Sequence, residues 1–86
     1  MMEDQDIHGA LERVFHEVFD DATISIYPEM SAREIEQWDS FNHVRLIVAV
    51  EERFNVNFST TEVAELKNVG ELIVLIRIHL AGKSAD

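Results

Sequence analysis

The sequence has no cysteine, one proline and three glycines among its 86 residues. Without cysteine the chain can form neither a disulfide framework nor a thiolate metal site, and this composition suits a reducing compartment. No apolar run reaches the roughly 20 residues that a membrane-spanning helix needs, so stable membrane insertion is not expected. The N-terminal residues 1–6 are acidic, unlike the basic start of a secretory signal. We therefore expect a cytoplasmic protein.

Basic residues are also scarce in this chain. Seven lysines and arginines stand against 17 aspartates and glutamates, which gives a formal net charge of -10. Because phosphate groups repel an acidic surface, nucleic acid is not an expected partner, whereas proteins with basic patches are. Residues 1–43 contain eleven acidic and two basic residues, so most of the acidic excess lies in the N-terminal half.

Helical periodicity dominates the apolar residues that are present. They make up 47% of the chain, enough for one small core in a single domain over residues 1–86, with the core at about 6–81. They recur at three- and four-residue steps, the spacing of one helix face. The expected elements are helices over 6–20, 40–54, about 60–66 and 69–81, with a long connection over 21–38. We predict an all-α fold, a small antiparallel four-helix bundle with three longer helices and one short one, present as a monomer.

Polar residues and a glycine mark the expected helix ends. Capping boxes pair a serine with a glutamate three residues later, and two such pairs occur in this chain. One would hold a short helical turn inside the long connection, and the other would open the short third helix. The residues expected to cap or stop helices are Asp4 or Asp6, Ser31 with Glu34, Ser59 with Glu62, Asn68 and Gly82.

The second helix has apolar residues on two opposite faces, although a bundle helix needs only one. At about 100° per residue the core face holds Leu46, Ile47, Val50 and Phe54. Phe41, Val44 and Val48 lie roughly opposite, flanked by charged residues, and are typical of a recognition surface. The alternative is that the connection 21–38 folds back and covers Phe41.

Ser40 stands where this second helix begins. Free backbone N–H groups and the helix dipole favour an anion there, so a phosphodiester on the Ser40 hydroxyl would lie in a favourable field. The neighbouring Asp39 offers a carboxylate that a modifying enzyme can recognise. On its own, however, an Asp-Ser pair before a helix is much more typical of an ordinary N-cap than of a modification site.

The surroundings of Ser40 resemble the signature of acyl carrier proteins. In that family an Asp-Ser pair opens the second helix, and an apolar run, paired glutamates and a phenylalanine follow at fixed spacing. The matching residues in the helix are Asp39, Ser40, Val44, Leu46, Ala49, Glu51, Glu52 and Phe54. The matching residues downstream are Phe58, Glu62, Val63, Leu66 and Val69. The resemblance covers about residues 38–80.

The resemblance implies a four-helix bundle and a carrier that is not itself an enzyme. It implies that a phosphopantetheinyl transferase attaches a 4′-phosphopantetheine arm to Ser40, with Asp39 in the recognised sequence. Acyl groups then ride on the arm as thioesters to ligases, synthases or acyltransferases of fatty-acid-like, lipid or secondary-metabolite synthesis. The second apolar face and its charged flanks give the expected partner-binding residues, which are Phe41, Val44, Arg45, Val48, Glu51 and Glu52. The residues that could line an acyl pocket, or simply pack the core, are Leu46, Ile47, Phe58, Val63 and Leu66.

Several residues of the second helix depart from the family pattern. Phe41 replaces the usual leucine, and Arg45 stands where fatty-acid carriers commonly have an acid. Residues 40–54 contain two acidic and two basic residues, so the recognition helix is neutral in a very acidic protein. This balance predicts a specialised carrier whose partners depend less on long-range attraction to this helix.

Other readings remain open at this point. The chain could be a free-standing peptidyl or aryl carrier, or an unmodified helical adaptor in which Ser40 is only a cap. His43 could neighbour the arm or be a partly buried spectator. No spacing typical of a catalytic group, a phosphate loop or a metal site is present, so we expect neither catalytic residues nor a bound metal.

Overall fold

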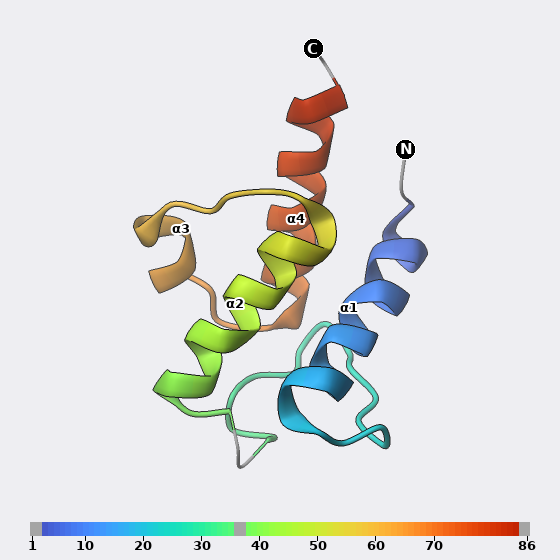
Figure 1. Ribbon diagram of the computed structural model, residues 1–86, viewed down its shortest axis with the longest axis vertical. Coiled ribbons are helices and arrows are strands. Elements are labelled where there is room, and N and C mark those ends of the chain that lie inside the picture. The colour runs from blue at the N-terminus through green and yellow to red at the C-terminus, as the bar shows by residue number, and fades with distance from the viewer. Residues whose placement is uncertain (1–2, 36–37, 85–86) are drawn as a thin grey trace.

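Four helices make up the computed structural model, which describes residues 3–35 and 38–84 (Figure 1). The helices are α1 (Asp4–Phe19), α2 (Ser40–Phe54), α3 (Thr60–Ala64) and α4 (Val69–Ser84). No strand occurs within these described ranges, which confirms the all-α prediction. The long connection before α2 also forms as expected, although its residues 36–37 lie outside the described residues.

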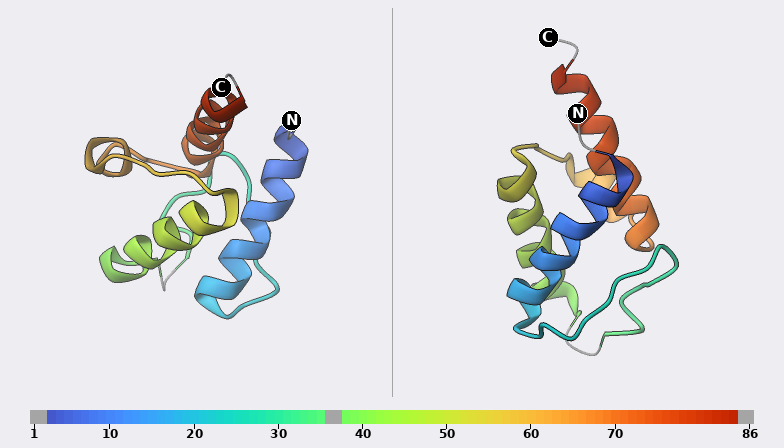
Figure 2. Two further views of the ribbon diagram at one scale, coloured as in Figure 1. Left: turned by 45° about the horizontal axis from the view of Figure 1, so that its top comes forward. Right: turned by 90° about the vertical axis from the view of Figure 1, so that its right-hand side faces the viewer.

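The core lies where α1 packs against both α2 and α4. In the right-hand view of Figure 2, α1 lies in front of α2 and α4, and it contacts both. Phe15 of α1 is fully buried, and the edge of its ring meets Trp38 at a centroid distance of 5.3 Å. The α2 residues predicted to face the core are all buried: Leu46, Ile47, Val50 and Phe54. Amphipathic packing therefore positions α2 as its periodicity predicted.

Hydrogen bonds hold the long connection to α1 and to α4. The backbone N–H of Ile26 donates to the Glu12 carboxylate of α1 at 3.0 Å, and Ile26 is itself buried. Further along, the carbonyl of Pro28 accepts from the backbone N–H of Gly70 at 2.8 Å. A Cβ atom at position 70 would lie only 3.1 Å from that carbonyl oxygen, so glycine allows the close approach. The connection thereby supplies an acceptor to the first turn of α4.

The predicted capping box at Ser59 forms with both of its bonds and opens a helix, whereas Ser31 and Glu34 form the half in which the serine N–H donates to the glutamate. The Ser59 N–H donates to the Glu62 carboxylate at 2.8 Å, and the Glu62 N–H donates to the Ser59 hydroxyl at 3.1 Å, at the start of α3. The bond from the Ser31 N–H to the Glu34 carboxylate closes only a single turn of the connection. α3 ends at Ala64, two residues earlier than expected.

The ends of α1 and α4 differ in part from the expectation. Glu3 is the N-cap residue of α1, and its N–H donates to the Asp6 carboxylate at 3.2 Å, so Asp6 supports the start and Asp4 does not cap it. Asn68 accepts from the Glu71 N–H at 2.9 Å, as predicted for α4. The prediction that Gly82 stops α4 was wrong, because the helix continues to Ser84. A glycine inside a helix costs about 1 kcal/mol relative to alanine but does not by itself end it.

Candidate functional site

Asp39, and not Ser40, caps the start of α2. The Asp39 carboxylate accepts a hydrogen bond from the Asn42 N–H at 2.9 Å, and its carbonyl accepts from the His43 N–H at 2.8 Å. Ser40 is the first residue of the helix, and both Asp39 and Ser40 are exposed. The Ser40 hydroxyl is therefore not needed as the cap, which weakens the reading of Ser40 as a purely structural residue.

Trp38 anchors this helix start to the core. Its side chain is only 8% exposed, and its indole N–H donates to Nδ1 of His43 at 3.0 Å. The two rings stack with an interplanar angle of 20°. His43 is thereby given a defined partner, which the sequence did not predict. The bond joins the last turn before Asp39 to the first turn of α2, so it fixes the backbone on both sides of Ser40.

A pocket of about 510 Å³ opens directly beside Ser40. Its walls come from the connection, the first turn of α2, the segment between α3 and α4, and the first turn of α4. Both apolar and polar groups line it, including the cation Lys67 and the carboxylate Asp39. The main lining residues are Trp38, Ser40, His43, Leu66, Lys67 and Leu72. This pocket, called the Ser40 pocket below, can accommodate a flexible chain attached to the serine.

The five residues suggested for an acyl pocket do not gather around the Ser40 pocket. Leu46 is fully buried and Ile47 is 6% exposed, and both belong to the hydrophobic core. Phe58 and Val63 are partly buried and pack against the same core. Among the five, Leu66 alone lines the Ser40 pocket. Leu46 and Ile47 therefore lie in the core, and their place in an acyl pocket stays a prediction.

The second apolar face of α2 is open to solvent. Phe41 is 72% exposed, Val44 60% and Val48 45%, and we call these three residues the α2 patch. The connection 21–38 does not bury Phe41, so the alternative that it covers this ring is wrong. An exposed phenylalanine beside two exposed valines on one helix face is typical of a protein-binding surface.

The charged residues around the α2 patch have different roles. Arg45 is exposed, and its guanidinium donates to the Asn42 side-chain oxygen at 3.0 Å. The Glu51 carboxylate accepts from the Phe58 N–H at 2.9 Å, so it holds the turn after α2. Glu52 is exposed. Arg45 and Glu52 are therefore the predicted partner-binding charges that face solvent most directly.

The short helix α3 is tied to α4 by a histidine. Nε2 of His79 lies 3.1 Å from the Glu62 carboxylate, and the His79 ring meets Phe58 edge-on at 5.1 Å. Hydrogen bonds to the Glu62 carboxylate lower its pKa from the ordinary value of 4.5. The bond from the Ser59 N–H has the larger effect, and the one from His79 follows. These contacts hold the start of α3 against α4.

Neither a metal-binding cluster nor a membrane-spanning helix is seen in the described part of the chain. No group of three or more histidine, aspartate or glutamate side chains there is arranged to hold a metal ion. None of the helices over residues 3–35 and 38–84 is long and apolar enough to cross a membrane.

Comparisons with known proteins point to one kind of molecule. No protein-family model matches the chain. The chain is 33% identical over 69 residues to an acyl carrier protein of Acidothermus cellulolyticus, which covers 80% of this chain and 82% of that relative. Its fold is similar to the NMR structure of a holo acyl carrier protein from Geobacter metallireducens, with a TM-score of 0.87 and 40% identity over 92% of this chain and 91% of the other.

Proposed function

Because this chain belongs to the acyl carrier protein family, we propose that it holds acyl groups as thioesters on a 4′-phosphopantetheine arm attached to Ser40. Acyl carrier proteins are carriers and not enzymes, so the chain presents cargo to partners without transforming it. The observation that carries the proposal is the exposed Ser40 at the first position of α2, next to a cap formed by Asp39 and beside the Ser40 pocket.

The geometry around Ser40 suits a phosphodiester. Its side chain is exposed, so an incoming transferase can reach the hydroxyl without unfolding α2. The N–H groups and dipole at the helix start favour the added negative charge, and Lys67 in the wall of the Ser40 pocket adds a cation. The Geobacter relative is a holo acyl carrier protein, which supports the same modification here.

The loading reaction transfers a phosphoryl-linked arm from coenzyme A. The Ser40 oxygen forms a new P–O bond to the phosphorus that carries the pantetheine, and the pyrophosphate P–O bond of coenzyme A breaks. The adenosine bisphosphate leaves with the electron pair, and a base of the transferase accepts the proton of the serine hydroxyl. When bound, the arm supplies a terminal thiol that forms thioesters, which explains how a chain without cysteine can serve as a carrier.

The residues around Ser40 would hold and orient the base of the arm. The Trp38–His43 pair fixes the backbone on both sides of the attachment point. Leu66 and Leu72 give the Ser40 pocket an apolar side on which the methylene groups of an arm or its cargo can rest. Because the backbone around Ser40 is fixed and the Ser40 pocket is open, the arm would be anchored at its base and free to move at its thiol end.

The partners would bind mainly through the α2 patch. Helix α2 contains Arg45 and Arg53 against Glu51 and Glu52, so its formal charge is zero. Apolar contact with Phe41, Val44 and Val48 then contributes more than charge attraction to the docking of a ligase, synthase or acyltransferase. We therefore propose a specialised carrier that serves a dedicated lipid or secondary-metabolite pathway.

Intact mass spectrometry tests the carrier proposal. The purified protein is incubated with coenzyme A and a promiscuous phosphopantetheinyl transferase, and the expected result is a mass gain of one phosphopantetheine group. Ser40→Ala should show no gain, whereas Ser25→Ala, at another exposed serine, should gain the group normally. A folded wild-type protein that gains no mass would instead favour the alternative hypothesis, in which the chain is an unmodified helical adaptor.

A further inference from the structure

Helix α4 exposes apolar side chains that the core does not use. Val74 is 41% exposed and Ile78 is 58% exposed, and they lie one turn apart on the same side of the helix. We call these two residues the α4 stripe. Other apolar residues of α4 already meet the core: Val69, Leu72, Ile73 and Ile76. The α4 stripe is thus an additional apolar face that packing inside this chain does not explain.

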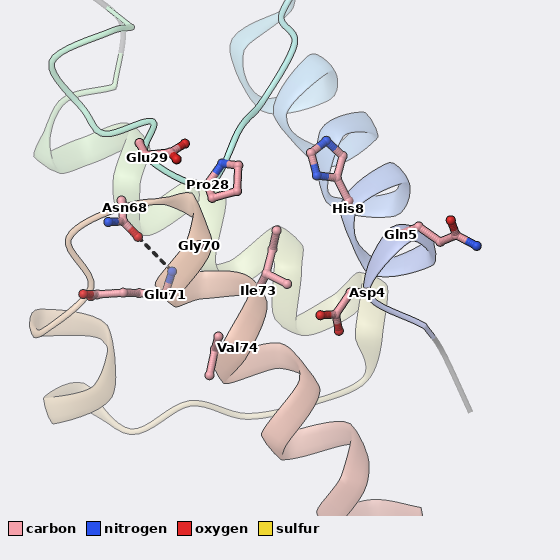
Figure 3. Close-up of a pocket in the computed structure, with 10 residues that line it drawn as sticks. All are labelled: Asp4, Gln5, His8, Pro28, Glu29, Asn68, Gly70, Glu71, Ile73 and Val74. Carbon is pink, nitrogen blue, oxygen red and sulfur yellow. Dashed lines mark hydrogen bonds between the residues drawn. The ribbon is translucent and has the colours of Figure 1, made fainter.

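Two hollows flank the α4 stripe. The first, of about 840 Å³, lies between α1, the connection at Pro28 and α4, and we call it the α1–α4 hollow (Figure 3). The second, of about 710 Å³, lies between α3 and α4, and we call it the α3–α4 hollow. Glu71 and Val74 line both hollows, so the two open on either side of the same turn of α4.

The interior of the α1–α4 hollow is largely hydrocarbon. Figure 3 shows Ile73 in its centre, with Pro28 and His8 on the facing segments. Asp4 lies near the end of the hollow, where its carboxylate pairs with Arg77 at 2.8 Å. An apolar centre within a polar rim is typical of a protein-binding surface.

The rim of both hollows is acidic. Five carboxylate residues line them: Asp4, Glu29, Glu62, Glu65 and Glu71. Lys67 lines the α3–α4 hollow, and Arg77 pairs with Asp4, so the surface keeps an excess of three negative charges. Helix α2, by contrast, has no net formal charge. The surface around the α4 stripe is therefore more acidic than α2.

We propose that the α4 stripe and its two hollows bind a basic amphipathic helix of a partner protein. Such a helix presents apolar anchors at three- and four-residue spacing, which fits a two-residue stripe with a hollow on each side. Lysine or arginine residues beside those anchors would meet the acidic rim. A second copy of this chain fits poorly, because each copy has a net charge of -10, and an anionic lipid surface is repelled for the same reason.

The α4 stripe itself does not overlap the Ser40 pocket, although Leu66 and Lys67 line both that pocket and the α3–α4 hollow. The α4 stripe and the α2 patch lie on different helices, and neither contains Ser40. A partner held at α4 would leave α2 open to a second protein. Binding at α4 also does not require the arm, so the inference stands or fails independently of the proposed function.

Peptide binding to the unmodified Ser40→Ala protein tests the inference without any arm or cargo. The probe is a designed peptide of about 18 residues, or five helical turns, with leucine on one face and lysine on the other. Calorimetry measures its Kd, and backbone amide NMR shifts locate its site. The expected shifts fall on residues 4–8, 62–67 and 70–78. A peptide with glutamate in place of lysine should not bind, because the rim repels it.

Matched valine variants separate this site from non-specific attraction to an acidic protein. Val74→Ser on α4 and Val48→Ser on α2 make the same change at 41% and 45% exposure. We expect Val74→Ser to weaken peptide binding about tenfold and Val48→Ser to leave it unchanged. Ile78→Ser provides a second α4 variant if circular dichroism shows that Val74→Ser loses helix. Absence of peptide binding, equal effects of the α4 and α2 variants, or shifts centred on α2 would overturn the proposal.

Discussion

The indole N–H of Trp38 donates to Nδ1 of His43 at 3.0 Å, and the two residues stand on opposite sides of Ser40 along the chain. Trp38 belongs to the end of the connection and is packed against Phe15 of the core, whereas His43 is part of the first turn of α2. Nδ1 of His43 accepts this bond and so carries no proton. Because Trp38 is packed in the core, the bond also links the position of Ser40 to the hydrophobic core.

Removing the acceptor of this bond should destabilise the fold. In His43→Phe the ring remains, but the largely buried Trp38 N–H loses its partner, which typically costs about 1–3 kcal/mol. Urea unfolding followed by circular dichroism measures the difference. His8→Phe is the control, because His8 lies 3.9 Å from its nearest carboxylate, Glu12, and should change stability little. Equal unfolding midpoints for both variants would contradict the role assigned to the bond.

Substitutions at Asp39 and Ser40 should have different effects on stability. Asp39→Ala removes the side chain that caps α2 and should cost about 0.5–2 kcal/mol. Ser40→Ala should leave stability nearly unchanged, because the serine is not the cap. Thermal unfolding of the two variants checks the order, and a larger loss for Ser40→Ala would show that the serine has a structural role after all.

The charge of Asp39 can be separated from its capping function. Asn is as good a cap as Asp, so Asp39→Asn should keep the stability of the wild type. If a transferase recognises the carboxylate, as we propose, kcat/KM for arm transfer should fall about tenfold in the same variant, equivalent to the loss of one charge-assisted contact. A stable Asp39→Asn protein that is loaded at the wild-type rate would remove Asp39 from the recognised surface.

Acid should weaken the attachment of α3 through Glu62. Its pKa is lowered in the folded protein by the Ser59 N–H and by His79, so its contribution to stability is present above the ordinary value of 4.5 and is lost as pH falls through the lower folded value. Glu62→Gln should therefore lose less stability than the wild type between neutral pH and about pH 3.5. Glu65→Gln, just outside the capping box, should follow the wild type, and parallel pH curves for all three proteins would contradict the assignment.

The neutral α2 should make arm transfer and partner docking weakly dependent on salt. Arg45→Glu turns this helix acidic and should raise kcat/KM with a basic transferase about two- to tenfold at low ionic strength, with a steeper fall as NaCl is added. Arg13→Glu makes the same charge change on the exposed side of α1 and serves as the control. Identical salt profiles for the two variants would show that α2 charge does not set partner choice.

Helix positions followed from the sequence because amphipathic spacing and capping residues are local signals. Leu46 and Val50 are buried where their periodicity placed them, and Asn68 caps α4. The prediction that Gly82 ends α4 failed because a glycine ends a helix when its backbone is left-handed. No described glycine has a positive φ. Local signals therefore indicated where the helices begin better than where they stop.

The surroundings of Ser40 could not be predicted from spacing alone. Its pocket combines residues of the connection with Leu66 and Leu72, which come from distant parts of the chain. The partnership of Trp38 with His43 depends on the path of the backbone through the turn at Asp39, which a helical wheel does not describe. The resemblance carried by residues 38–54 predicted Ser40 as the attachment site, which stays a prediction, and the fold showed that Asp39 is the helix cap.

The most direct test of Ser40 as the attachment site is to locate the arm on the chain. Wild-type protein is loaded with coenzyme A and a transferase, digested, and analysed by tandem mass spectrometry of its peptides. We predict that the peptide containing Ser40 carries the phosphopantetheine group and that fragmentation assigns it to this serine. A group found on Ser25, Ser31 or Ser59, or an unmodified Ser40 peptide from the folded protein, would contradict this prediction.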